Sequence, residues 1–158
     1  MKIIVFSDSH GDLSNMANII EQELPDLMFH LGDHWRDAEE IEWEYPELKV
    51  IKVPGNCDWR STEPLELKVT VEGVRFLLCH GHTRGVKMGY SELAHFAANE
   101  KVDVALFGHT HRAHWSRRGR VQLLNPGSCG MGREPSYAIV TVENGTAACE
   151  IKKVFEED

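Results

Sequence analysis

The sequence of 158 residues has no apolar run long enough to span a bilayer and no segment that resembles a secretory signal. Its four cysteines lie far apart and form no C-x-x-C pair. Acidic residues exceed basic ones, and the net charge of −8 disfavours nonspecific binding to nucleic acids or acidic membranes. We therefore expect a reduced, cytoplasmic protein with no membrane association and no stable nucleic-acid partner.

Internal repeats, low-complexity linkers and breaks in composition are lacking as well, so residues 1–158 are expected to form a single domain. This length allows a sizeable core without disulfides. The hydrophobic share of 42% and the charged share of 27% are ordinary for a globular chain. Histidine is the one unusual component, with nine residues.

The first half of the chain alternates strand and helix patterns. It predicts strands at residues 2–6, 27–31 and 49–53, and helices at residues 13–23 and 37–45. Asp12 is the expected cap of the first helix, and Pro46 ends the second. This order implies an α/β protein in which parallel strands are joined by right-handed crossovers.

The second half indicates antiparallel strands. It predicts strands at residues 65–71, 74–79, 104–107, 121–124, 136–142 and 147–154, and a helix at residues 91–100. Ser91 is the candidate cap of that helix, and Asn144-Gly145 is a strong turn signal. The basic residues Arg112, Arg117, Arg118 and Arg120 are expected either to lie on a solvated hairpin or to contact a larger anionic substrate, and His114 is expected in a polar loop. The tail 156–158 is expected to be frayed.

The first predicted strand ends abruptly at Ser7-Asp8-Ser9-His10-Gly11. In extended backbone, residues i and i+2 project to the same side, so Asp8 and His10 are expected to face one ion. A strand that leads through a loop into a helix places such side chains at the carboxyl end of a sheet, where α/β proteins build their sites.

Four later segments repeat this arrangement of an apolar strand followed by metal-capable side chains. The candidate metal ligands of the five segments are Asp8, His10, Asp33, Asn56, His80, His109 and His111. All are nitrogen or oxygen donors, which suits a hydrolytic site for Mn²⁺, Fe, Ni²⁺ or Zn²⁺ better than a closed structural zinc site. Seven ligands exceed what one tetrahedral ion uses, so we expect two ions, with Asp33 as the bridging carboxylate.

In this order the segments D-x-H, G-D, G-N-C-D, H and G-H-x-H resemble the motif series of the calcineurin-like metallophosphoesterases. The short length and the Asn125-Pro126-Gly127-Ser128 loop resemble the small YfcE-type phosphodiesterases in particular. The resemblance implies an α/β fold in which two mixed sheets pack as a sandwich with helices outside. It also implies a metal-dependent phosphodiesterase that hydrolyses a small phosphate ester with water or hydroxide activated by two metals.

Position by position, the resemblance gives each metal four ligands. The first metal receives Asp8, His10, Asp33 and His111, and the second receives Asp33, Asn56, His80 and His109. Asn56 contributes a neutral oxygen, which preserves the positive charge of the site. Because the ligands mix imidazole, carboxylate and amide, we expect Mn²⁺ to serve best and Ni²⁺, Co²⁺, Fe or Zn²⁺ to substitute.

The proton donor is the least defined part of the predicted site. Cys57 occupies the position where many superfamily members have a histidine that protonates the leaving oxygen, and it is interpreted either as inert or as a poor substitute. His82 is the alternative catalytic residue, or else a simple loop histidine. Trp35 and Trp59 adjoin the loops and are expected either to wall the cleft or to pack in the core.

Other functions remain open from the sequence. A phosphomonoesterase or a nuclease of the same fold is the main alternative. A protein-interaction scaffold is a further one, because the retromer subunit of this fold acts in that way. That subunit lacks part of the histidine set, whereas this chain keeps every ligand position. An exposed edge among the antiparallel strands would also allow a homodimer.

Overall fold

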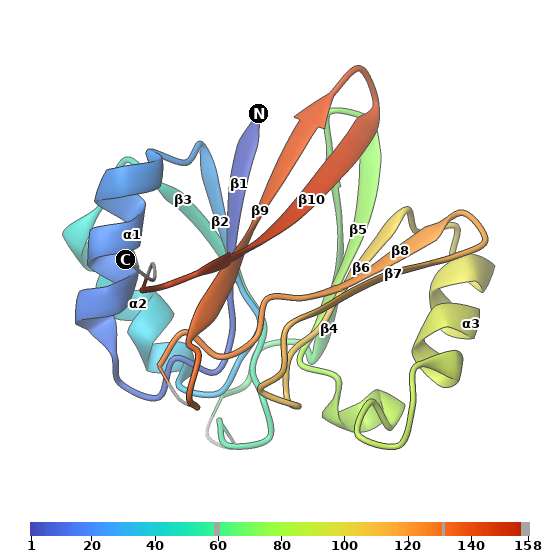
Figure 1. Ribbon diagram of the computed structural model, residues 1–158, viewed down its shortest axis with the longest axis horizontal. Helices are drawn as coiled ribbons and strands as arrows, with labels where there is room; N and C mark the ends of the chain where they lie inside the picture. Colours follow the sequence, from blue (N-terminus) through green and yellow to red (C-terminus); the bar gives the residue numbers. More distant parts are fainter. Residues whose placement is uncertain (59–60, 131, 156–158) are drawn as a thin grey trace.

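Two five-stranded sheets form the centre of the protein in a computed structural model that describes residues 1–58, 61–130 and 132–155 (Figure 1). In spatial order, the first sheet contains β10 (Thr146–Lys153), β9 (Ser136–Glu143), β1 (Lys2–Phe6), β2 (Leu27–His30) and β3 (Lys49–Lys52). The second contains β4 (Glu66–Val71), β5 (Val74–Cys79), β6 (Val104–Leu106), β8 (Val121–Asn125) and β7 (His114–Arg118). The helices are α1 (Leu13–Glu23), α2 (Trp35–Glu44), α3 (Ser91–Asn99) and the 3₁₀ helix η1 (His82–Arg84).

Both sheets are mixed, which confirms the fold class expected from the sequence. In the first sheet, β1, β2 and β3 are parallel, whereas β9 and β10 are antiparallel to their neighbours. In the second, β5, β6 and β8 are parallel, and the edge strands β4 and β7 are antiparallel. Figure 1 shows the sheets facing each other, with α1 and α2 outside the first and α3 outside the second.

Alternation along the strands divides the apolar residues between the interior of the sandwich and the helices. In β1, Ile3 and Val5 pack between the sheets, while Ile4 and Phe6 pack against the α1 and α2 side. In β5, Phe76 and Leu78 point inward and Leu77 packs against α3. Because each sheet has apolar side chains on both faces, one face can join the sandwich and the other can bind helices.

Two local expectations are corrected by the structure, and a third is confirmed. The basic segment expected to form a hairpin does so, because strand β7 pairs with β8, but His114, expected in a loop, lies in β7 and is paired with Asn125. Helix α3 begins at Ser91, but its N-cap is Tyr90 and no side chain caps it. The expected cap of α1 is confirmed, because Asp12 accepts a hydrogen bond from the Asn15 amide at 3.2 Å. The tail 156–158 lies outside the described residues.

The topology brings the carboxyl ends of β1, β2, β3, β5 and β6 to one rim, at the bottom of Figure 1. Parallel strands within each sheet account for this, because they end on the same side. The loops that follow these five strands contain every candidate ligand predicted from the sequence. None of the described helices is long and apolar enough to cross a membrane.

Candidate metal centre

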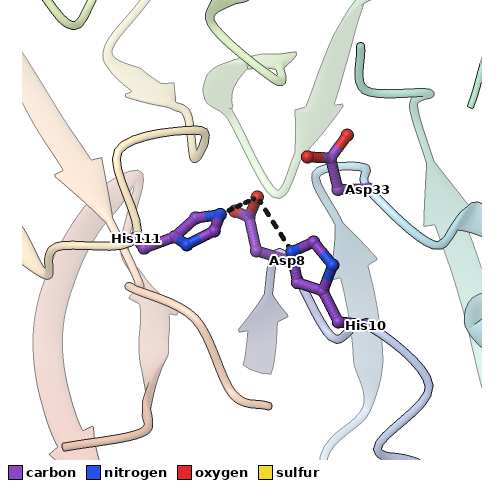
Figure 2. A group of neighbouring side chains, drawn as sticks. All are labelled: Asp8, His10, Asp33 and His111. Atoms are coloured by element: carbon purple, nitrogen blue, oxygen red, sulfur yellow. Dashed lines mark ion pairs between the residues drawn. The ribbon is translucent and has the colours of Figure 1, made fainter. Parts of the chain in front are cut away.

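Six charged or imidazole side chains from the strand-end loops converge at this rim in two overlapping groups. The first group contains Asp8, His10, Asp33 and His111, and the second contains Asp33, His80 and His109. Within each group, one ligand atom from every residue lies within 4.8 Å of the others. Figure 2 shows the first group, with both imidazoles turned toward Asp8. Asp33 belongs to both groups, so the two positions that can hold a cation share one carboxylate.

Asp8 is fully buried and uses its two carboxylate oxygens differently. Oδ2 accepts hydrogen bonds from the Ser7 hydroxyl at 2.5 Å and from the His109 amide at 3.1 Å. Oδ1 has no hydrogen-bond partner among the described residues and lies 3.2 Å from Nε2 of His111. Burial raises the pKa of this carboxyl group, which its histidine neighbours only partly oppose. A buried oxygen without a partner, facing imidazole nitrogens, is suited to bind a cation.

The imidazole of His10 completes this side of the site. Its Nε2 lies 4.0 Å from Oδ1 of Asp8 and is buried without a hydrogen-bond partner among the described residues. Burial lowers the pKa of His10, so the ring is favoured in its neutral form. Neutral imidazole is the form that ligates a metal ion.

Asp33 is held by its neighbours in the charged state. Its Oδ1 accepts a hydrogen bond from the Cys57 amide at 2.9 Å, and its Oδ2 lies 3.4 Å from Nε2 of His80. Burial alone would raise the pKa of Asp33, but the His80 imidazole and the Cys57 amide outweigh it and hold the pKa well below its ordinary value. The shared carboxylate is therefore ionised at neutral pH.

The two histidines of the second group have defined orientations. Nδ1 of His80 donates to the Leu31 carbonyl at 2.8 Å, which leaves Nε2 facing the site. Such a bond from the second ring nitrogen to a carbonyl is typical of ligating histidines. Nδ1 of His109 lies 3.2 Å from Nε2 of His80. Burial, reinforced by the charge of His80, lowers the pKa of His109 to about 4. The ring is therefore neutral at neutral pH, which is the form that binds a metal ion.

The backbone of these loops differs from the extended geometry expected from the sequence. Asp8 and His10 have φ values of 54° and 48°, and Asp33, His109 and His111 have 56°, 70° and 61°. All five lie in the left-handed region, which Asp and His tolerate better than most residues. The prediction that Asp8 and His10 share a side was correct in its result but wrong in its geometric reason. Backbone of this kind is strained and is concentrated at functional sites.

Two glycines allow the loops to approach closely enough for this convergence. A Cβ at Gly55 would lie 2.2 Å from Oδ1 of Asp33, and a Cβ at Gly108 would lie 2.0 Å from the Ser7 hydroxyl. Any side chain at either position would displace a carboxylate of the site or the group that holds it. The glycines of the G-N and G-H-x-H segments are thus required sterically.

Three further residues predicted to act at the site lie beside these groups. Asn56 is exposed, and its Nδ2 lies 3.8 Å from Sγ of Cys57. His82 has its ring centroid 5.5 Å from that of His80, and its buried Nδ1 has no partner among the described residues. Burial, with a contribution from His80, lowers the pKa of His82. The thiol of Cys57 has a raised pKa, because of burial and the neighbouring Asp33 charge.

The residues that support the ligands were not predicted as functional from the sequence. They include Ser7, Ser9, Asp37, Asn125 and Ser128, which bond to ligand side chains, to the loop backbone or to one another. Ser128 donates to the Asp8 carbonyl at 2.7 Å, and Asn125 donates to the Gly108 carbonyl at 3.1 Å. Asn125 and Ser128 were noted only as part of the loop that carries the family resemblance, and the other three have no signal in the sequence beyond their position in or beside a strand-end loop. Of the two tryptophans, Trp35 is partly buried with Lys52 over its ring, and Trp59 lies outside the described residues.

Comparison with known proteins identifies the family. Residues 1–145 match the Calcineurin-like phosphoesterase superfamily domain. The chain belongs to this superfamily. It is 37% identical over 155 residues to the probable metallophosphoesterase YsnB of Bacillus subtilis, covering 93% of this chain and 88% of that one. It is 29% identical over 169 residues to the phosphodiesterase YfcE of Escherichia coli, covering 89% and 87% of the two chains.

Solved structures of this superfamily agree with the fold. A conserved uncharacterized protein of Streptococcus pneumoniae TIGR4 (predicted phosphoesterase) superposes with a TM-score of 0.82 at 27% identity, over 97% of this chain and 89% of that one. Vps29 of Entamoeba histolytica complexed with zinc superposes with a TM-score of 0.76 at 18% identity, over 98% and 100% of the two chains. The second likeness concerns the fold alone. The resemblance seen in the sequence to YfcE-type phosphoesterases is confirmed.

Proposed function

We propose that this calcineurin-like phosphoesterase hydrolyses small phosphate diesters with two divalent cations held at the rim of the sandwich. The observation that carries the proposal is the sharing of Asp33 between two groups of metal-capable side chains. A charged carboxylate between two sets of imidazoles is the arrangement that a pair of neighbouring cations requires. The partnerless Oδ1 of Asp8 further supports a cation in the first group.

We assign the first cation to Asp8, His10, Asp33 and His111, and the second to Asp33, Asn56, His80 and His109. In support, the Asp and His residues of this assignment lie within the two groups of neighbouring ligand atoms. Asn56 lies outside these groups; it is exposed, next to Cys57. Asn56 is included because it directly precedes the residue whose amide holds Asp33. Bound cations would supply charge neutralisation at the phosphoryl oxygens and lower the pKa of a water molecule.

Contacts within the chain hold two of the ligands, Asp33 and His109, in the forms that bind a cation. Asp33 stays ionised because His80 and the Cys57 amide stabilise its charge. His109 stays neutral because it is buried beside His80. Ser7 and the His109 amide hold Oδ2 of Asp8, so Oδ1 is directed at the first position. These contacts prepare the site before a cation enters, which lowers the cost of binding.

A pocket of about 430 Å³ lies beside the first group and offers room for part of a substrate. It is lined by His34, Trp35, Arg36, Glu39, Cys57, Asp58 and Ser61. The rings of His10 and His34 lie 5.0 Å apart, which places the pocket next to the first group. We propose that this pocket accepts one ester group of a diester. On the other side, His82 lies beside His80 and is our candidate to contact the leaving oxygen.

The proposal is tested by removing and restoring metal. Chelation should abolish hydrolysis of an activated aryl diester such as bis(p-nitrophenyl) phosphate. Mn²⁺ should restore it best and Mg²⁺ little, because Mg²⁺ prefers oxygen-rich octahedral sites over imidazole. Activity that persists after thorough chelation would contradict a metal-dependent mechanism.

The same assay separates the competing functions. Diesters, monoesters, cyclic nucleotides and short oligonucleotides are compared by kcat/KM under identical metal conditions. A preference for monoesters would favour a phosphomonoesterase, and a preference for oligonucleotides would favour a nuclease. No hydrolysis of any ester by a protein that binds two Mn²⁺ ions would favour the interaction scaffold.

A further inference from the structure

Three buried polar side chains lie behind the candidate metal centre without belonging to either group of ligands. Ser9 and His30 are fully buried, and Asp37 is 6% exposed. They come from the loop after β1, the end of β2 and the first turn of α2. Burying polar groups is costly unless they are hydrogen-bonded, so their mutual arrangement needs an explanation.

Their hydrogen bonds form one continuous chain. The Gly32 amide donates to Nδ1 of His30 at 3.2 Å, so the ring proton is on Nε2. Nε2 lies 2.9 Å from the Ser9 oxygen and donates a hydrogen bond to it. The Ser9 hydroxyl in turn donates a hydrogen bond to Oδ2 of Asp37 at 2.6 Å. The same Oδ2 accepts from the Gly11 amide at 2.7 Å. Oδ2 of Asp37 is therefore the final acceptor of the chain and binds two donors.

These bonds hold the residues on both sides of His10 in the sequence. Ser9 precedes it, Gly11 follows it, and both are fixed to the same oxygen of Asp37. His10 and Gly11 both have left-handed backbone, with φ values of 48° and 86°. A non-glycine residue keeps that conformation only where its surroundings impose it. The Asp37 carboxylate holds both neighbours of His10, together with the backbone bonds that the Ser9 and Gly11 carbonyls accept from the Asp12 and Leu13 amides.

The same contacts join two ligand loops. Asp37 lies in the first turn of α2, which begins two residues after Asp33, and its charge is favoured at the N-terminus of a helix. His30 binds the Gly32 amide, directly before Asp33, and the Ser9 hydroxyl, directly before His10. The position of His10 relative to Asp33 is therefore fixed by side chains that touch neither candidate cation.

The geometry points to Asp37 as a positioning residue for the first cation site, acting through Ser9 and Gly11 on His10. This inference rests on the proposed function, because it requires a cation at that site. Residues of this kind typically change metal affinity by about 10–100-fold. Asp37 should accordingly matter more for the first cation than for the second, because the second site shares Asp33 but not His10 and takes His80 and His109 from other loops.

The test is calorimetric titration of Mn²⁺ into the metal-free full-length protein. The parent should bind two ions. Asp37→Ala should weaken the first site by about 10–100-fold and leave the second within about twofold. Asp37→Asn keeps an acceptor oxygen but no charge, so its affinity should lie between that of Asp37→Ala and the parent. Ile41→Val is the matched control, because it alters the buried core of the same helix without touching the loop.

A double-mutant cycle then shows whether Asp37 acts through His10. In a His10→Ala background, Asp37→Ala should cause no further loss at the first site, because the ligand it positions is already gone. A general structural role predicts a further loss at the first site in that background. A lowered thermal midpoint is expected for either role, because Asp37→Ala leaves the Ser9 hydroxyl and the Gly11 amide without their acceptor, so the loss of metal affinity is compared with the loss of stability. Thermal unfolding of each metal-free variant is therefore recorded beside the titration.

The outcomes distinguish this inference from the proposed function. If the parent binds no Mn²⁺, both are wrong. If the parent binds two ions and Asp37→Ala binds both equally well, or loses both equally, the positioning role of Asp37 is overturned and the proposed function is unaffected. If Asp37→Ala does not fold, Asp37→Asn decides, since a first-site affinity equal to that of the parent overturns the inference.

Discussion

His30 makes the stability of the protein depend on pH in a way that can be calculated. The side chain is fully buried in β2, and burial lowers its pKa to about 4 from the ordinary value of 6.5. Its Nδ1 accepts a bond from the Gly32 amide, so a second ring proton would break that contact. The unfolded chain, in which the ring is solvated, binds the proton more tightly than the folded protein. Lowering the pH through 6.5 toward 4 therefore favours unfolding.

The size of the effect follows from the interval between the two pKa values. Full titration across that interval corresponds to about 3 kcal/mol of unfolding free energy, of which about 2 kcal/mol is lost by about pH 5. This is a large share of the stability of an ordinary domain, which totals about 5–15 kcal/mol. The contribution is fully present above pH 6.5 and is absent below pH 4.

Urea unfolding of the metal-free protein at about pH 7.5 and about pH 5 measures this contribution. The parent should lose about 2 kcal/mol more between the two conditions than His30→Gln, which cannot titrate. Ile41→Val should be less stable than the parent by about 0.5–1.5 kcal/mol at both pH values and should keep its pH dependence.

Other groups titrate in the same range, and the comparison removes them. Burial also lowers the pKa values of His10, His82, His109 and His114. These histidines are present in both the parent and His30→Gln, so the difference between the two proteins isolates His30. If His30→Gln kept the full pH dependence of the parent, the reasoning about its buried neutral ring would be refuted.

Three further predictions concern the chemistry of the site. Asp33→Asn should remain folded but lose at least one of two Mn²⁺ ions and nearly all activity, because Asp33 belongs to both groups of ligands. Metal analysis of the purified variant tests this prediction. Cys57→Ser should change kcat/KM little, because a thiol of raised pKa is a poor acid, whereas a large loss would show that the thiol takes part. Cys57→His should raise kcat/KM mainly on alkyl diesters, by at most the about 10²–10⁴-fold of a positioned acid, because Asp58 accepts only one amide bond at each oxygen and can also orient the imidazole.

Much of the fold could be predicted because its signals are local. The apolar runs marked every parallel strand, and helix α1 was predicted with its bounds and its Asp12 cap. The basic segment was expected only as a solvated hairpin, and the bounds of strand β7 were not predicted, because the strand is short, basic and mostly exposed. It forms a strand because β8 offers it an edge with which to pair, and that is a property of the assembled sheet. The packing of the two sheets was likewise expected only from the family resemblance.

The candidate ligands could be predicted because their chemistry is conspicuous at the ends of strands. Asp8 and His10 stand out after an apolar run, although the left-handed backbone that makes them converge could not be foreseen. That backbone depends on bonds from distant segments, such as the one between the Gly11 amide and Asp37, 26 positions away. Spacing along the chain therefore located the donors without revealing how they are held.

Asp37 shows why the supporting residues could not be found in the same way. It begins an acidic stretch of α2 that also contains Glu39, Glu40 and Glu42, and nothing in the composition distinguishes it from them. The distinction arises in the fold, where Asp37 is buried under the β1 loop while Glu39 and Glu40 are exposed. A ligand is recognised by its type, because few residues bind metals, whereas a positioning residue is recognised by its burial and its partners. If the calorimetric test separates Asp37 from the rest of α2, the precision of the metal centre will have been traced to a carboxylate that never contacts the metal.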